Sequence, residues 1–202
     1  MNDSDVEILE VQPAYRGYGR VDRYRLQHRL HDGSQSRPIN REVYDRGHVA
    51  AVLLYDPDED AVVLLEQFRI GAYLTGMNSW QIEAVAGIID PGETAEQVAM
   101  REAQEEAGLV VADLEPICRY IVSPGAITET VRLFIGRVDS RGAGGVHGLH
   151  HEGEDIKVEA VPVARLPQML ADGTIANALT IIAVQWLLLH RESLRARWLG
   201  RR

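Results

Sequence analysis

Apolar runs and short turns alternate along most of the chain, and this pattern predicts strands joined by hairpins. Residues 49–55 and 61–66 are continuous apolar runs separated by an acidic turn at residues 56–60. Two such runs around one turn predict a hairpin of buried strands. The same reasoning predicts further strands at residues 80–86, 117–123, 130–138 and 156–163.

The N-terminal part has a different pattern, in which polar and apolar positions alternate. Val6, Ile8 and Val11 predict one strand, and residues 15–29 predict two short strands around Gly17-Tyr18-Gly19. An ordinary antiparallel sheet is the simpler interpretation. The functional alternative is a small dimerisation module that also carries substrate contacts. We therefore predict an N-terminal β-sheet segment at 1–45 and a main domain at 46–202.

Helical periodicity appears at residues 93–107, 166–171 and 175–198. Strands and helices mix, but hairpins replace regular βαβ units, so the sequence predicts the α/β (α+β) class, with a mixed sheet packed between helices. The most apolar stretch, residues 175–189, is too short to span a bilayer and predicts a buried helix. Residues 139–155 are rich in glycine and histidine and predict a mobile loop.

Composition limits the classes of function. The chain has 202 residues and a formal net charge of −9. That charge argues against broad nucleic-acid binding, which needs a basic face. Cys118 is the single cysteine, lies in the apolar run Pro116-Ile117-Cys118, and is predicted to be a buried, inert thiol. The acidic N-terminus is followed by no apolar stretch, so we expect a cytoplasmic protein without a secretory signal or membrane anchor.

Residues 87–109 concentrate the candidate chemistry. Asp90-Pro91-Gly92 predicts a loop, and a helix is expected to begin near Thr94. Gln97 lies three residues after Thr94 and completes a capping box. An apolar stripe facing the core is predicted for Ala95, Val98, Ala99 and Ala103. Gly108 is expected to end the helix in the left-handed conformation.

Three glutamates are expected to cluster on this helix. Glu102 and Glu106 are four residues apart and share one face, and Glu105 lies beside them. Like charges this close destabilise a helix, but bound Mg²⁺ offsets the repulsion because it prefers oxygen ligands. Arg101 is placed to pair with Glu93 through a bidentate contact. A solvated helix face with salt bridges is the plain alternative for the glutamates alone.

The complete pattern in this segment is Gly-x5-Glu-x7-Arg-Glu-U-x-Glu-Glu-x-Gly-U, where U is apolar. Average residue usage gives it a chance on the order of one in ten million of arising anywhere in such a chain. It resembles the box of the Nudix hydrolase family and meets every specified position. The flanks are similar to those of bacterial ADP-ribose pyrophosphatases within that family, at Tyr15-Arg16-Gly17, His28-Arg29-Leu30, Arg46-Gly47-His48, Glu66-Gln67-Phe68-Arg69, Ser123-Pro124-Gly125, His147-Gly148-Leu149 and Glu152-Gly153-Glu154-Asp155-Ile156.

The resemblance implies a Nudix fold and a metal site. The implied ligands are a backbone carbonyl before the box, two box glutamates and one loop glutamate: Ala86, Glu102, Glu106 and Glu154. Two or three Mg²⁺ ions are implied, with Mn²⁺ as a substitute. Glu152 would activate the attacking water, and Arg101 and Glu105 would belong to the catalytic cluster. The spacing of the loop histidines fits no compact zinc site.

The resemblance also implies substrate contacts. Arg69 is expected near the pyrophosphate, and Arg41 with Tyr18 around the adenine, because a tyrosine ring and a guanidinium are both flat partners for a base. Further contact positions are Glu42, Arg46, Ile88, Ser123 and Glu129, the last from a partner subunit. Tyr18 departs from the phenylalanine of the nearest relatives but keeps the flat ring. A homodimer with exchanged N-terminal sheets is implied.

The expected reaction is hydrolysis of ADP-ribose to AMP and ribose 5-phosphate. One alternative is another nucleoside diphosphate sugar of the GDP-mannose or ADP-glucose type, since base choice depends on pocket edges that spacing does not define. A second alternative is a non-catalytic regulator that senses ADP-ribose. The intact box, the acidic charge and the lack of a spare basic helix-turn-helix argue against the regulator.

Overall fold

The computed structural model describes residues 1–149 and 153–200, which divide into two compact units. The first unit comprises Met1–His48 and Tyr120–Val131, and the second comprises Val49–Arg119 and Arg132–Arg202. The sequence analysis predicted a division between residues 45 and 46. It did not predict that residues 120–131 belong with the N-terminal segment. The role of that segment in dimerisation stays a prediction.

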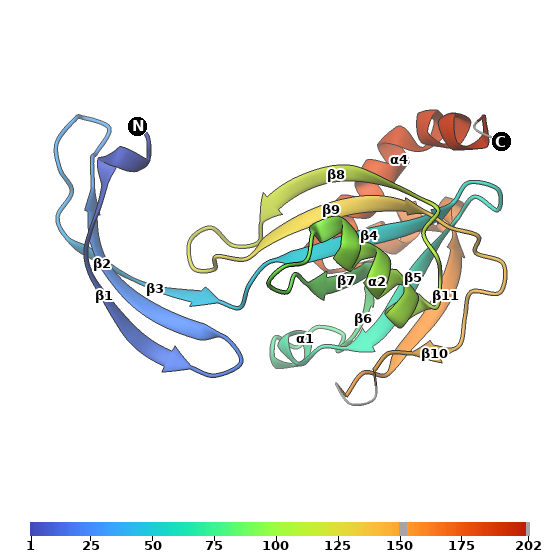
Figure 1. Cartoon of the computed structure of the whole chain (residues 1–202), viewed down its shortest axis with the longest axis horizontal. Coiled ribbons are helices and arrows are strands. Elements are labelled where there is room, and N and C mark those ends of the chain that lie inside the picture. The colour runs from blue at the N-terminus through green and yellow to red at the C-terminus, as the bar shows by residue number, and fades with distance from the viewer. Residues whose placement is uncertain (150–152, 201–202) are drawn as a thin grey trace. The chain divides into compact units, whose positions relative to one another are not determined.

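The first unit contains a three-stranded antiparallel sheet in the order β1-β2-β3 (Figure 1). The short 3-10 helix η1 (Asp3–Asp5) precedes β1 (Val6–Arg16), β2 (Arg20–His28) and β3 (Ile39–Asp45). The predicted turn at Gly17-Tyr18-Gly19 is confirmed, but the strand predicted around residues 6–11 and the first short strand after it form one continuous strand, β1. Strand β3 was not predicted. Every residue of β1 is exposed in this chain. Pro13 is tolerated within β1 because the register shifts between Pro13 and Tyr15.

An eight-stranded sheet organises the second unit, with the path β10-β11-β5-β4-β9-β8 and with β6 paired to β5 and β7 to β4 (Figure 1). Its strands are β4 (Val49–Asp56), β5 (Ala61–Phe68), β6 (Trp80–Glu83), β7 (Val85–Ile88), β8 (Asp113–Ile121), β9 (Thr130–Arg137), β10 (Val146–His147) and β11 (Ile156–Pro162). The hairpin of buried strands predicted at residues 49–66 is confirmed as β4 and β5.

Helices cover both faces of this sheet. On one face lies α2 (Ala95–Ala107) and on the other α4 (Ala178–Leu199). The shorter helices are α1 (Ile70–Leu74), η3 (Val163–Arg165) and α3 (Leu166–Ala171). Alternate β4 residues point to opposite faces, as strand geometry requires. Val52 and Leu54 join the core cluster of α2, whereas the Tyr55 ring lies 6.1 Å from the Trp198 ring of α4. This is the predicted αβα arrangement, and it carries α2 over β4 and β7.

Two local predictions were wrong. The single strand predicted at residues 80–86 is divided at Ala84, whose N–H donates to Thr180 Oγ1 of α4 at 2.9 Å. The flanking residues therefore pair with different neighbours, β6 with β5 and β7 with β4. Cys118 is exposed rather than buried, because β8 is the last strand of the path and its side chains alternate. The short helix α1 was not predicted.

Within residues 1–149 and 153–200, no helix has the length and apolar character needed to cross a bilayer.

Candidate active site

The glutamates of the candidate site are carried by α2, whose ends are defined by local sequence. Thr94 Oγ1 accepts from the Gln97 N–H at 3.2 Å, and Gln97 Oε1 accepts from the Thr94 N–H at 2.8 Å. This is the predicted capping box, and it satisfies two backbone donors at the helix start. Gly108 closes the helix at φ 67°, a left-handed conformation that glycine adopts without steric cost. The buried stripe on α2 is also as predicted: Ala95, Val98, Ala99 and Ala103.

Arg101 ties together three carboxylates around the first part of the site. Its Nε and Nη2 donate to the two oxygens of Glu93, each at 3.2 Å, in the bidentate pair predicted from the sequence. Its Nη1 donates at 2.9 Å to both Glu102 and Glu105. Paired charges of this kind fix geometry as well as adding attraction. Arg101 therefore holds the loop residue Glu93 against the acidic face of α2.

Gly87 forms a cradle for the Glu102 side chain. A Cβ on Gly87 would overlap the carboxylate and Cγ of Glu102. No larger residue fits there unless Glu102 moves. The first glycine of the box is thus required by the close approach of strand β7 to the Glu102 carboxylate.

Glu106 is the most deeply buried carboxylate of the cluster, with 3% of its surface exposed. Its Oε2 accepts from the Ala86 N–H at 3.1 Å, so β7 also fixes this side chain. Ala86 itself is held in the sheet opposite Ala51 of β4. The candidate ligand residues Ala86 and Glu106 are therefore in direct contact.

The loop after the box brings a further glutamate to this cluster. Glu154 Oε2 accepts from the Leu149 N–H at 2.8 Å, which fixes the end of the loop just before β11. The negative charge of Glu154 raises the pKa of both Glu102 and Glu106, so the three carboxylates lie within electrostatic reach. The candidate base Glu152 lies outside the described residues, as do His150 and His151.

The electrostatics of the cluster indicate a site that needs positive charge. Burial raises the pKa of Glu106 to about 8, and the Ala86 N–H opposes this only in part. Burial is also the main reason why the pKa of Glu102 is raised, with repulsion from Glu105 and Glu154 adding to it. Three carboxylates in partly buried surroundings repel one another, and a divalent cation removes that cost.

In the part of the chain that the structure describes, no group of three or more His, Cys, Asp or Glu side chains is placed to hold a metal ion. Oxygens of Glu102, Glu106 and Glu154 instead accept hydrogen bonds from Arg101, Ala86 and Leu149. The donor set nevertheless fits Mg²⁺, which prefers oxygen ligands. The site offers carboxylate oxygens and the backbone of β7, and Gly87 leaves room beside Glu102 because it has no Cβ.

Arg69 is held beside this cluster by a residue that the sequence analysis missed. Its Nε and Nη2 donate to Glu83 Oε2 at 2.9 and 2.8 Å, and Gln67 Nε2 donates to the same oxygen at 3.1 Å. Arg69 also lowers the pKa of Glu106 by its charge, so the guanidinium and the cluster are electrostatically coupled. The register that pairs Leu65 with Glu83 sets this geometry, and a linear pattern does not reveal it.

The remaining candidate of the second unit is Ile88. It ends β7 opposite Val49 and is half-buried. Ile88 follows Gly87 directly, so it lies near the cradle that Gly87 forms for Glu102.

The N-terminal candidates all belong to the first unit. Tyr18 lies at the tip of the β1–β2 turn and is 81% exposed. Arg41 and Glu42 are exposed neighbours on β3, opposite Tyr24 and Arg23 of β2. Glu42 pairs with Arg23 at 2.9 Å, and Arg41 Nη1 donates to the Asn40 carbonyl at 2.8 Å. Exposed flat groups of this kind are available to a ligand.

Arg46, Ser123 and Glu129 also lie in the first unit. Arg46 Nε donates to Glu129, whose side chain is only 7% exposed. The Ser123 carbonyl accepts from the Ala126 N–H at 3.1 Å and the Ile127 N–H at 2.9 Å, which closes the turn between β8 and β9. Two candidates on distant parts of the sequence, Arg46 and Glu129, are therefore direct partners.

Comparison with known proteins identifies the family. The NUDIX domain model matches residues 45–181. The chain belongs to the Nudix family. It is 45% identical to the ADP-ribose pyrophosphatase of Escherichia coli (strain K12) over 195 residues, which covers 96% of this chain and 93% of that protein. It is 37% identical to the GDP-mannose pyrophosphatase of Citrobacter koseri over 156 residues, with 76% and 79% of the two chains covered.

A solved structure supports the fold of this Nudix protein. The crystal structure of an ADP compounds hydrolase matches with a TM-score of 0.70 and 22% sequence identity, and the match covers 96% of each chain. A likeness at this identity concerns the fold. Membership of the family and the geometry of Gly87, Arg101, Glu102 and Glu106 agree with the Nudix box predicted from the sequence.

Proposed function

We propose that this Nudix protein is a Mg²⁺-dependent ADP-ribose pyrophosphatase that releases AMP and ribose 5-phosphate. The observation that carries the chemistry is the partly buried carboxylate cluster of Glu102, Glu106 and Glu154 around the Gly87 cradle. Support for the substrate comes from the relative that matches over nearly the full chain, which is an ADP-ribose pyrophosphatase.

The metal site proposed for this protein combines the Ala86 carbonyl with Glu102, Glu106 and Glu154. Two or three Mg²⁺ ions are proposed, with Mn²⁺ able to replace them. When bound, the ions neutralise charge that develops on the phosphate oxygens. Without an ion, the pKa of Glu106 is about 8. A nearby cation favours the charged carboxylate and so lowers this pKa, and Glu106 then loses its proton more readily.

The protein's own groups orient and activate the reactants. Arg101 keeps Glu102 and Glu105 on one side of the cluster. Arg69, steadied by Glu83, is proposed to contact the pyrophosphate. A water oxygen bonds to one phosphorus while the bridging P–O bond breaks, and Glu152 accepts the water proton. Glu152 is proposed as the base because it is a neighbour of the ligand Glu154 and not itself a ligand. Its lone pairs are therefore free to accept that proton.

The proposed recognition residues serve the nucleotide. Tyr18 and Arg41 are assigned to the adenine ring because both present flat groups to solvent. Further proposed contacts are Glu42, Arg46, Ile88, Ser123 and Glu129. We also propose a cytoplasmic homodimer that exchanges the N-terminal sheet. The exposed apolar side chains of β1, among them Val6, Ile8 and Val11, are consistent with a partner.

A second candidate substrate is another nucleoside diphosphate sugar, because a GDP-mannose pyrophosphatase is also similar to this chain. That similarity covers 76% of the chain, compared with 96% for the ADP-ribose pyrophosphatase. A panel of ADP-ribose, ADP-glucose and GDP-mannose ranked by kcat/KM separates the candidates. We expect ADP-ribose to rank first.

The catalytic assignment is tested by steady-state turnover of ADP-ribose with Mg²⁺. Glu152→Gln removes the proposed base while keeping the side-chain size, and general-base contributions are typically about 10²–10⁴-fold in rate. Glu159→Gln, an exposed neighbour on β11 paired with Arg165, is the matched control and should keep wild-type kcat. If Glu152→Gln retains most of the wild-type kcat, another residue is the base. Release of AMP by the wild type would eliminate a purely regulatory role.

A further inference from the structure

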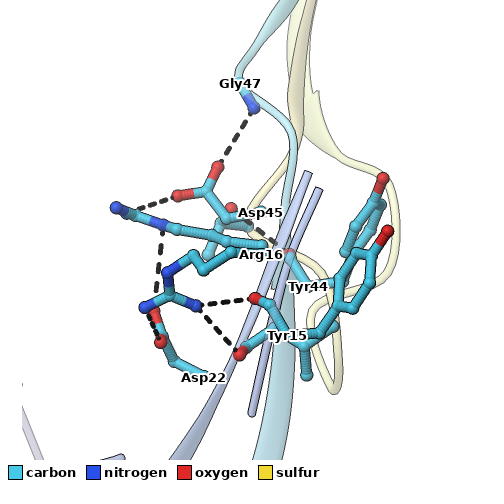
Figure 2. Close-up of polar contacts among 9 residues, drawn as sticks. Tyr15, Arg16, Asp22, Tyr44, Asp45 and Gly47 are labelled. Carbon is cyan, nitrogen blue, oxygen red and sulfur yellow. Dashed lines mark hydrogen bonds and ion pairs between the residues drawn. The ribbon is translucent and has the colours of Figure 1, made fainter. Parts of the chain in front are cut away.

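Three segments of the first unit that carry proposed substrate contacts meet at two consecutive residues, Tyr44 and Asp45. The segments are the β1–β2 turn with Tyr18, the end of β3 with Arg46, and the β8–β9 turn with Ser123 and Glu129. They are far apart in the sequence. Figure 2 shows the polar contacts among the side chains of this junction.

The β1–β2 turn is packed tightly although its tip is exposed. A Cβ on Gly19 would lie 2.5 Å from the Tyr44 ring, and a Cβ on Gly17 would overlap the Tyr15 hydroxyl. A side chain at either glycine would therefore displace the ring of Tyr15 or Tyr44. The rings of Tyr15 and Tyr44 pack against the backbone of this turn. Tyr18, between the two glycines, is 81% exposed.

Charged groups continue this fixation toward β3. Arg16 donates to Asp22 and to the carbonyls of Tyr15 and Val21 at 2.8 and 3.2 Å (Figure 2). Arg20 lies 3.8 Å from Asp22 and donates to Asp45 Oδ2 at 2.7 Å. The turn that presents Tyr18 is thus connected to Asp45 through Arg20, the first residue of β2.

Asp45 also contacts the chain around Arg46. Its Oδ1 accepts from the Gly47 N–H at 3.0 Å, which fixes the chain on both sides of Arg46 (Figure 2). The pKa of Asp45 is lowered mainly by this Gly47 hydrogen bond. One carboxylate is therefore bonded both to Arg20, next to the β1–β2 turn, and to the Arg46 segment.

The backbone of Tyr44 joins β3 to the third segment, the β8–β9 turn. Its N–H donates to the Ala126 carbonyl at 2.8 Å, and its carbonyl accepts from the Thr128 N–H at 3.1 Å. The residue after Thr128 is Glu129, which pairs with Arg46, the residue after Asp45. The backbone contacts therefore set the register that places Arg46 and Glu129 together.

We propose that Asp45 is a positioning residue for nucleotide recognition, holding the Tyr18 turn, Arg46 and the Glu129 turn in one arrangement before substrate arrives. The proposal rests on the function proposed above, because it needs these segments to contact the nucleotide. A preformed surface lowers the ordering cost of binding. Loss of Asp45 therefore weakens binding and leaves the chemical step of the bound substrate largely intact.

The kinetic test compares Asp45→Ala and Asp45→Asn with the matched control Asp32→Ala. Asp32 also accepts from the N–H two residues on, Ser34 at 2.9 Å, but it lies in the β2–β3 loop away from the three segments. Asp45→Ala should raise KM for ADP-ribose about tenfold, as for the loss of one good binding contact, with kcat within about twofold. Asp45→Asn keeps an acceptor for Gly47 but loses the charge for Arg20, so its KM should rise less.

A second readout, hydrogen exchange of the unliganded full chain, does not depend on the substrate. Asp45→Ala should raise exchange at residues 17–20, 46–48 and 124–129 together, whereas Asp32→Ala should raise it only near residues 31–36. Equal KM and exchange in Asp45→Ala and wild type would overturn the proposal. So would a loss of kcat without a change in KM.

The two readouts also separate the two proposals. If the wild type does not hydrolyse ADP-ribose but Asp45→Ala loosens all three segments, the proposed function fails and the structural junction stands. If Asp45→Ala does not fold, Asp45→Asn is measured by the same two readouts, and unchanged KM and exchange in that variant contradict the positioning role.

Discussion

The segment at residues 87–109 and the first unit organise their functional groups in opposite ways. In the segment, nearly every contact is local: Thr94 with Gln97, and Arg101 with Glu93, Glu102 and Glu105. In the first unit, contacts join distant positions, such as Arg46 with Glu129. The proposed metal-binding glutamates are thus concentrated on one short helix, with Glu154 added by a loop, whereas recognition depends on strand register. Damage to the first region should reduce kcat, and damage to the second should raise KM.

The largest expected effect comes from filling the Gly87 cradle. Gly87→Ala places a methyl group where the Glu102 carboxylate lies, so Glu102 must move. A displacement of about 1 Å at a reacting centre costs roughly 10²-fold in rate, and kcat should fall by about that factor. Folding should survive, because the group that must move is the flexible end of a side chain.

The matched control for this variant is Gly71→Ala, because a Cβ on Gly71 meets nothing within 4 Å. Turnover of ADP-ribose at saturating Mg²⁺ is measured for both variants. Wild-type kcat in Gly87→Ala would show that the Glu102 position is not critical.

A smaller effect is expected at the exposed tip of the first unit. Tyr18→Ala removes the proposed stacking partner of the adenine, and base–aromatic stacking contributes about 1–3 kcal/mol. KM for ADP-ribose should therefore rise about tenfold, with little change in kcat. Tyr18→Phe keeps the ring and should behave like the wild type. A tenfold loss in kcat at constant KM would contradict the division of roles between the two regions.

The last effect is on stability rather than turnover, and it is expected in the absence of metal. The folded-state pKa of Glu106 is raised to about 8 from an ordinary value of 4.5. A carboxyl with a raised folded pKa binds more protons in the folded than in the unfolded state, so its contribution to stability is present below about pH 4.5 and is lost as pH rises to about 8.

Thermal unfolding of the EDTA-treated protein measures this effect. Wild-type protein should lose stability over that pH window relative to Glu106→Gln, which cannot ionise, and added Mg²⁺ should restore it. Parallel pH curves for the two proteins without metal would contradict the electrostatic account of the cluster.

Contacts are mostly local in residues 87–109 and long-range in the first unit. This difference also explains which features could be predicted from the sequence. The cap at Thr94, the end at Gly108 and the Arg101–Glu93 pair depend on residues within a few turns, and spacing alone was sufficient. Burial of Glu106 was not predicted, although it shares a helix face with Ala99 and Ala103. Resemblance to the family supplied the loop glutamates, for which no spacing argument exists.

Contacts that depend on register were beyond the sequence pattern. Glu83 meets Arg69 only because β6 pairs with β5 after the chain divides at Ala84. The wrong prediction for Cys118 has a similar origin, since an apolar run does not reveal that its strand ends the sheet. Asp45 gave no signal either, because its partner Arg20 lies 25 residues away on another strand.

The carboxylate cluster on α2 and the loop after it are proposed to perform metal-dependent hydrolysis of ADP-ribose. A decisive experiment quantifies AMP and ribose 5-phosphate released from ADP-ribose by the purified protein, with Mg²⁺ and with EDTA. Equal amounts of the two products are expected with Mg²⁺ and essentially none with EDTA. Binding of ADP-ribose without release of AMP at any Mg²⁺ concentration would contradict this proposal.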